Sequence, residues 1–85
     1  MKQHITKEQW GELDKKILIE AFGEYGYHED DIIIGRMIEY LGDDLFKIEA
    51  LNQNYLVWLN DRKEINMNAE LCDALWEVCK YKLTQ

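Results

Sequence analysis

The spacing of apolar residues changes from a helical to a strand period at Asp43-Asp44, and this change constrains the fold more than any other feature of the chain. Before it, apolar residues recur every three or four positions, as they do on one face of a helix. After it, segments 45–51 and 55–59 are short and rich in aromatic and branched residues, which is typical of strands. We therefore expect an α+β fold with the order α-α-β-β-β-α, in which a three-stranded antiparallel meander packs on the helices.

Capping residues locate the first and last helices. Thr6 followed by Gln9 is a capping box, in which each side chain bonds to the backbone of the other residue. We therefore expect the first helix to begin at Lys7 and to continue to about Gly23. Near the other end of the chain, Asn68 is expected to cap a last helix over residues 69–83, with Trp76 beside its apolar stripe.

The second helix is expected to begin at a cap formed by Asp30 or Asp31 and to end at Leu41. Acidic residues at a helix start favour the positive end of the helix dipole, so part of the local acidity has a structural explanation. Gly42 follows the helix, at a position that commonly requires a left-handed backbone.

The two expected strands are joined by Asn52-Gln53-Asn54, which predicts a hairpin with a three-residue loop and Asn54 at positive φ. That register gathers five apolar residues on one face: Phe46, Ile48, Ala50, Leu56 and Trp58. The opposite face then carries four more, namely Leu51, Tyr55, Val57 and Leu59. These four either lie beneath a helix or form an interface with another chain. A turn over residues 60–63 leads to a third strand that contains Ile65 and Met67.

Most of the net charge of −7 lies in one quarter of the chain. Residues 23–44 contain a single cation, Arg36, and seven carboxylates: Glu24, Glu29, Asp30, Asp31, Glu39, Asp43 and Asp44. Such a localised negative field repels nucleic acid and anionic membranes and favours basic surfaces. We therefore expect a protein partner with a basic surface, and no direct binding of nucleic acid or membrane.

One short segment suggests a different chemistry. His28 is followed by Glu29, Asp30 and Asp31, which is the one place where a histidine meets several carboxylates. A cation-dependent module that uses His28, Asp30 and Asp31 is therefore an alternative. Ligands that are adjacent in sequence splay apart, however, and the spacing of a calcium loop is missing. We expect neither a metal nor another cofactor.

Nucleophilic catalysis is not indicated by the residues present. The chain has no serine, and its two cysteines, Cys72 and Cys79, lie seven residues apart in the last helix. That spacing is about 10.5 Å along a helix axis, which is beyond the reach of a disulfide. We expect both to be buried as small hydrophobic residues, and we do not expect an enzyme.

The sequence also gives expectations about organisation and location. Its 85 residues are expected to form a single domain, residues 1–85. The first residues lack the apolar core of a signal peptide, and no apolar run approaches the ~18 residues that span a bilayer. Together with unpaired cysteines, these features favour the cytoplasm.

Three segments, residues 5–9, 35–42 and 71–80, resemble parts of small uncharacterised proteins carried by bacteriophages and prophages. This resemblance implies a genomic setting and no functional residues. Phage accessory proteins of this size often bind a host protein, including host defence nucleases. We therefore expect a small acidic accessory protein that acts by protein–protein interaction, for example by inhibiting a host defence protein. A structural homodimer is an alternative.

Overall fold

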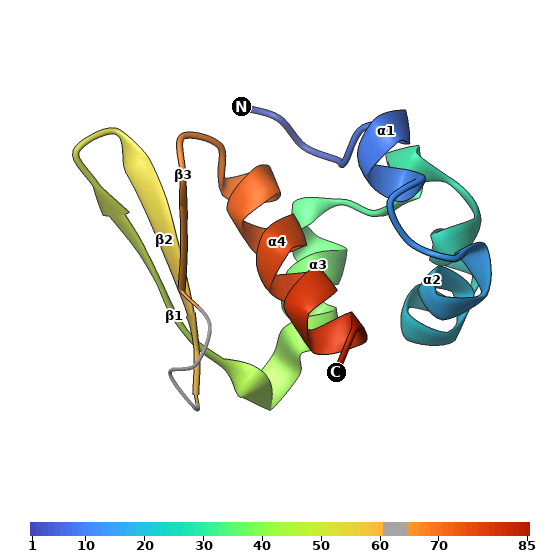
Figure 1. Ribbon diagram of the computed structural model, residues 1–85. Helices are drawn as coiled ribbons and strands as arrows, with labels where there is room; N and C mark the ends of the chain where they lie inside the picture. Colours follow the sequence, from blue (N-terminus) through green and yellow to red (C-terminus); the bar gives the residue numbers. More distant parts are fainter. Residues whose placement is uncertain (61–64) are drawn as a thin grey trace.

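The computed structural model describes residues 1–60 and 65–85 (Figure 1). It confirms the expected α+β class and the order of helices, three strands and a final helix. The elements are α1 (Lys7–Trp10), α2 (Lys15–Phe22), η1 (Gly23–Tyr27), η2 (Glu29–Asp31), α3 (Ile34–Leu41), η3 (Gly42–Asp44), β1 (Leu45–Leu51), β2 (Asn54–Leu59), β3 (Ile65–Asn68) and α4 (Leu71–Leu83). The turn expected over residues 60–63 lies, from Asp61 onward, outside the described residues.

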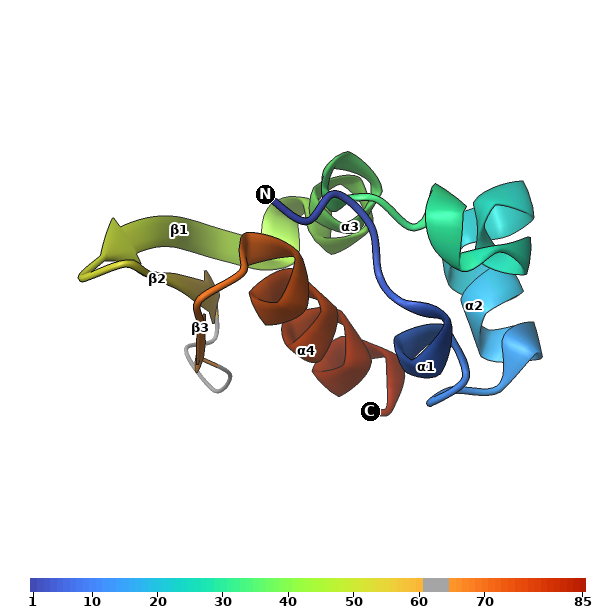
Figure 2. The same ribbon diagram turned by 90° about the horizontal axis from the view of Figure 1, so that it is seen from above.

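Helix α4 lies against one face of the antiparallel sheet, whose strand order is β1-β2-β3. Helix α3 packs on α4, and α2 lies at the end of the molecule far from the sheet (Figures 1 and 2). The core therefore forms around α4, which buries Cys72, Ala74, Leu75, Trp76, Val78 and Cys79. Trp76, expected beside the apolar stripe, is fully buried.

The first expected helix is divided into α1 and α2. The capping box is confirmed, because the Gln9 amide N–H donates to Thr6 Oγ1 at 3.1 Å and the Thr6 N–H donates to Gln9 Oε1 at 2.8 Å. The chain then turns after Gly11, and the Asp14 carboxylate caps a new helix by accepting from the Lys16 N–H at 2.9 Å. The prediction of one continuous helix was wrong because it missed this second cap.

Helix α3 begins at Ile34, later than expected, and Asp30 and Asp31 do not cap it. They lie in the short turn η2. The backbone between η2 and α3 is extended because it pairs with the N-terminal segment, through an isolated bridge between His4 and Ile33. The expected positive φ at the end of the helix is confirmed, with φ of 49° at Gly42, but its ψ of −128° lies outside the left-handed helical conformation.

The hairpin connection has two residues instead of three. Asn52 and Gln53 both have positive φ, which is the backbone of a type I′ turn, and Asn54 already belongs to β2. Ile48 consequently pairs with Val57 instead of Trp58. Because side chains alternate between the faces of a strand, this shift of one residue moves Ile48 and Ala50 to the opposite face from Leu56 and Trp58. The apolar face predicted from the sequence was therefore wrong.

The face that α4 covers includes two residues predicted as candidates for an interface. Val57 is 0 % and Leu59 is 5 % exposed. Tyr55 is half-buried on the same face, whereas Leu51 is exposed on the other one. Of the two explanations for these four residues, cover by a helix is the correct one for Val57 and Leu59, so neither can form an interface.

Helix α4 begins at Leu71, two residues later than expected. The Asn68 side chain forms a turn just before it, because its Oδ1 accepts from the Glu70 N–H at 3.1 Å. Both cysteines are buried, as expected.

Candidate functional site

The face of the sheet that points away from α4 carries a continuous set of large apolar side chains. We call this the outer sheet face, and it consists of Lys47, Glu49, Leu51, Leu56, Trp58, Ile65 and Met67. Ile65 and Leu51 are each 52 % exposed, and Met67 is 64 % exposed. In Figures 1 and 2 the helices lie on the other side of the sheet.

Cross-strand pairing places these apolar residues side by side. Trp58 on β2 pairs with Ile65 on β3, and Leu56 pairs with Met67. Directly opposed side chains on one sheet face contact each other, so the four form one patch across two strands. The sequence indicated Ile65 and Met67 as strand residues but not as site residues. Their exposure follows from the pairing of β3 with β2, which places them on the face opposite to α4.

The charges on the outer sheet face balance. Lys47 pairs with Trp58 across the hairpin and Glu49 pairs with Leu56. The Lys47 Nζ lies 3.6 Å from Glu49 Oε2 and 3.9 Å from the centroid of the Trp58 ring. The lysine therefore makes both an ion pair and a cation–π contact. This face is thus neutral in a chain whose net charge is −7.

The structure does not gather the seven candidate carboxylates into one patch. Glu24, Glu29, Asp30 and Asp31 lie in η1 and η2, far from the sheet in both views of the molecule (Figures 1 and 2). Glu39 is exposed on α3, and Asp43 and Asp44 lie in η3, directly before β1.

Three of these carboxylates lie beside a lysine or histidine side chain. Asp44 Oδ2 is 2.7 Å from Lys82 Nζ, and Asp30 Oδ1 is 3.5 Å from His4 Nε2. Asp30 thus approaches a histidine other than His28, whose Nδ1 lies 3.7 Å from Glu29 Oε2. Within residues 1–60 and 65–85, no three histidine, cysteine or acidic side chains are grouped so that they could hold a metal ion.

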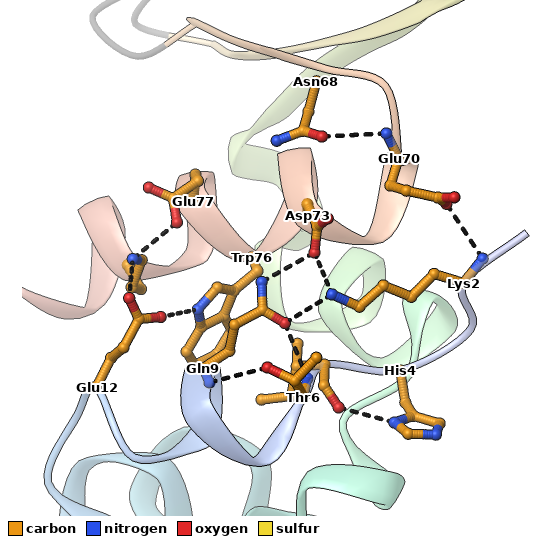
Figure 3. Close-up of polar contacts among 12 residues, drawn as sticks. Lys2, His4, Thr6, Gln9, Glu12, Asn68, Glu70, Asp73, Trp76 and Glu77 are labelled. Carbon is orange, nitrogen blue, oxygen red and sulfur yellow. Dashed lines mark hydrogen bonds and ion pairs between the residues drawn. The ribbon is translucent and has the colours of Figure 1, made fainter.

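A network of hydrogen bonds and an ion pair connects the N-terminal segment, residues 1–9, to α4 (Figure 3). Lys2 forms an ion pair with Asp73 and donates to Gln9 Oε1 at 2.9 Å, and Gln9 Nε2 donates to Asp73 Oδ1 at 2.9 Å. Partial burial raises the pKa of Asp73, but the hydrogen bonds from Lys2 and Gln9 outweigh it, so the pKa lies below its usual value. Asp73 is therefore a structural anion at neutral pH.

Glu12 makes the second contact between the N-terminal part and α4 (Figure 3). Its Oε1 accepts from the Trp76 indole N–H at 2.8 Å, and its Oε2 lies 3.1 Å from Lys80 Nζ. The hydrogen bond from Trp76 is the main reason that the pKa of Glu12 is lowered. Partial burial raises the pKa and Lys80 lowers it further, so the net direction is down. The contact satisfies the one polar atom of a tryptophan that is otherwise in the core.

The cysteines have the chemistry of core residues. Burial raises the pKa of the Cys72 thiol to about 11 and that of Cys79 to about 12. Both side chains therefore stay protonated at neutral pH, and a protonated thiol is a poor nucleophile and a poor metal ligand.

The surface also has a shallow hollow of about 320 Å³ beside the C-terminal end of α4. Lys82 is its cation, and this side chain already bonds to Asp44 and to the Tyr40 carbonyl, at 3.3 Å. The hollow therefore offers a ligand no free cation among its described lining residues. The outer sheet face is the better candidate for a functional site.

No helix within the described ranges is both long and apolar enough to cross a membrane. Comparison of the chain with protein-family models, with curated proteins and with solved structures finds no match.

Proposed function

We propose that this protein acts by binding another protein chain, and that the outer sheet face is the binding surface. The observation that carries the proposal is the exposure of Leu51, Ile65 and Met67 on one face, by more than half of each residue's surface. Exposed apolar residues are common singly, but a contiguous set on a rigid element is typical of an interaction surface.

The energetics of this face support the proposal. Full burial of one large aliphatic side chain contributes about 1.5–3 kcal/mol, and a partner that covers Ile65, Met67 and Leu51, each already partly covered, gains roughly half of that from each. Trp58 lies on the central strand of the face, and tryptophan is enriched among residues that dominate binding energy. The strands already hold the backbone of this face in place, so binding orders side chains only.

The carboxylates of residues 23–44 add a second element to the proposal. A protein of net charge −7 attracts basic partners over long range and speeds their encounter. In the setting that the resemblance to phage and prophage proteins implies, the basic partner is a host protein that this chain inhibits. The carboxylates steer this encounter.

The experiment compares two variants that make the same charge change at exposed apolar residues. Met67→Lys alters the outer sheet face, and Tyr27→Lys alters a residue in η1 that is 53 % exposed. Tagged wild type and both variants are used to capture proteins from a bacterial lysate to which untagged wild-type chain is added. We expect wild type and Tyr27→Lys to capture the same protein, and Met67→Lys to fail to capture it. Equal capture by all three chains would show that the outer sheet face is not the binding surface.

A further inference from the structure

We infer that the chain bound by the outer sheet face is a second copy of this protein, so that two sheets pack face to face in a symmetric dimer. This inference rests on the proposed function, and it names the partner of the same surface. Its basis is the distribution of charge over the molecule and the pattern of residues on the outer sheet face.

Self-association of a chain with a net charge of −7 is favoured through a surface that carries no net charge. The outer sheet face meets this requirement, because it carries one lysine and one glutamate, Lys47 and Glu49, 3.6 Å apart. The carboxylates of η1 and η2 lie at the end of the molecule away from the sheet (Figure 2). Packing through the sheets therefore places these acidic ends outermost in the dimer.

Distance and pairing reduce the remaining repulsion. The molecule extends 34 Å along its longest axis, whereas charges are screened over about 8 Å at physiological ionic strength. Of the two carboxylates next to β1, Asp44 is paired with Lys82. Asp43, the other carboxylate of η3, is exposed.

The residue pattern selects one symmetric arrangement. A two-fold axis that crosses the strands at the middle of β2 places β1 over β1 of the second copy, running in the opposite direction. Lys47 then faces Glu49 of the second copy, and Glu49 faces its Lys47. The same axis brings Leu56 over Trp58, and Ile65 over Met67. Each contact occurs twice, as an isologous interface requires.

The other two-fold arrangement is less favourable. An axis parallel to the strands places β1 over β3, so that Lys47 and Glu49 cover Ile65 and Met67. Both charges would then lose water to an apolar surface without gaining a new partner. The pairing of opposite charges across the first arrangement therefore determines the orientation.

The size of the face predicts a weak dimer. Three strands about 4.8 Å apart and up to seven residues long present on the order of 300 Å² in projection. With protruding side chains, two such faces bury on the order of 1,000 Å² in total, which is the lower limit for a specific interface. We expect a dissociation constant on the order of 10 µM.

The first test is the mass of the purified protein by light scattering or sedimentation, over concentrations up to about 1 mM. Wild type and Tyr27→Lys should change from monomer to dimer, and Met67→Lys should stay monomeric with an unchanged melting temperature. A wild type that is monomeric at about 1 mM, or a Met67→Lys chain that dimerises as well as wild type, would overturn the inference.

The second test reverses charges one at a time. Lys47→Glu and Glu49→Lys should each dimerise at least about tenfold more weakly than wild type, because like charges then meet across the axis. A mixture of the two variants, labelled with different fluorophores, should form a mixed dimer that recovers the loss. Mixing without any gain in affinity would contradict the arrangement.

The two proposals fail in different ways. If wild type stays monomeric but the lysate capture is still lost in Met67→Lys and kept in Tyr27→Lys, another protein occupies the outer sheet face. In that case the inference fails and the proposed function stands. If wild type stays monomeric and all three chains capture the same proteins, the inference and the proposed function both fail.

Discussion

Val57 and Trp58 are neighbours in β2, yet they belong to opposite sides of the protein. Val57 is fully buried beneath α4, and Trp58 lies on the outer sheet face with the Lys47 Nζ 3.9 Å from the centroid of its ring. The register of the hairpin decides this division, because it sets which residues of β1 accompany each of them. The candidate site and the core therefore depend on the same turn.

The turn itself is open to a direct test. Gln53 has φ of 65°, and a residue other than glycine is strained there. Gln53→Gly should stabilise the protein by about 0.5–1 kcal/mol in urea unfolding, because the relief of strain exceeds the added entropy of the unfolded chain. Asn54→Gly, in the first residue of β2, should destabilise it. A three-residue loop with Asn54 at positive φ would reverse these two outcomes.

The core around α4 should be far more sensitive than the outer sheet face. Leu75 is completely buried, so Leu75→Ala should lower the free energy of unfolding by about 2–5 kcal/mol. Met67→Ala, at dilute concentration, should change it by less than about 0.5 kcal/mol, because Met67 is exposed. Equal effects of the two substitutions in urea titrations would mean that Met67 is packed in the fold and that the face is misassigned.

The hydrogen bond between Trp76 and Glu12 should contribute more to the free energy of unfolding than the neighbouring ion pair of Lys80 and Glu77. Glu12→Ala leaves the indole N–H of a buried tryptophan without its acceptor, which costs about 1–3 kcal/mol. Glu77 contacts the same lysine, Lys80, at 2.7 Å, but does not bond to Trp76. Glu77→Ala should therefore cost less than about 1 kcal/mol. Thermal melts in which the two variants coincide would argue against the Trp76 bond.

Acid should loosen the contact between the N-terminal segment and α4. The pKa of Asp73 is lowered in the folded protein, so the unfolded chain takes up this proton more readily. The stabilisation is complete above the usual pKa of 3.8 and is lost as the pH falls through the lower, folded value. Asp73→Asn should therefore lose less stability than wild type between about pH 5 and pH 2.5. Parallel losses in the two proteins would contradict the role of Asp73.

The cysteine thiols should be unreactive in the folded protein. Cys72 and Cys79 are fully buried, and burial raises their pKa to about 11 and about 12. A thiol reagent at about pH 8 should label neither in buffer and both in denaturant, because only the thiolate reacts. Rapid labelling of the native protein would show that α4 is not packed as described.

The sequence predicted features that depend on neighbouring residues and missed those that depend on distant ones. The Thr6 capping box, the positive φ of Gly42 and the burial of the α4 cysteines follow from local chemistry, and all are confirmed. The late start of α3 could not be seen locally, because it follows from a bridge between His4 and Ile33, which are far apart in the chain.

The candidate site was missed for a related reason. The sequence predicted a three-residue loop with Asn54 at positive φ, and the resulting register exchanged the faces of β1. Two of the four residues predicted as a possible interface, Val57 and Leu59, are core residues because α4 covers their face of β2. The carboxylates of residues 23–44 are close in sequence but not in space, because η2 precedes α3 and η3 follows it.

The most direct measurement is the oxidation rate of the three methionines at increasing protein concentration. Met67 lies on the outer sheet face, Met1 is 69 % exposed elsewhere, and Met37 is fully buried, so the chain contains its own two controls. Peroxide treatment followed by mass spectrometry should show Met67 oxidised as fast as Met1 in dilute protein and increasingly protected as the concentration rises. Met1 should stay reactive and Met37 protected throughout. If Met67 is oxidised as fast as Met1 at every protein concentration, and in lysate as well, the outer sheet face binds no protein chain.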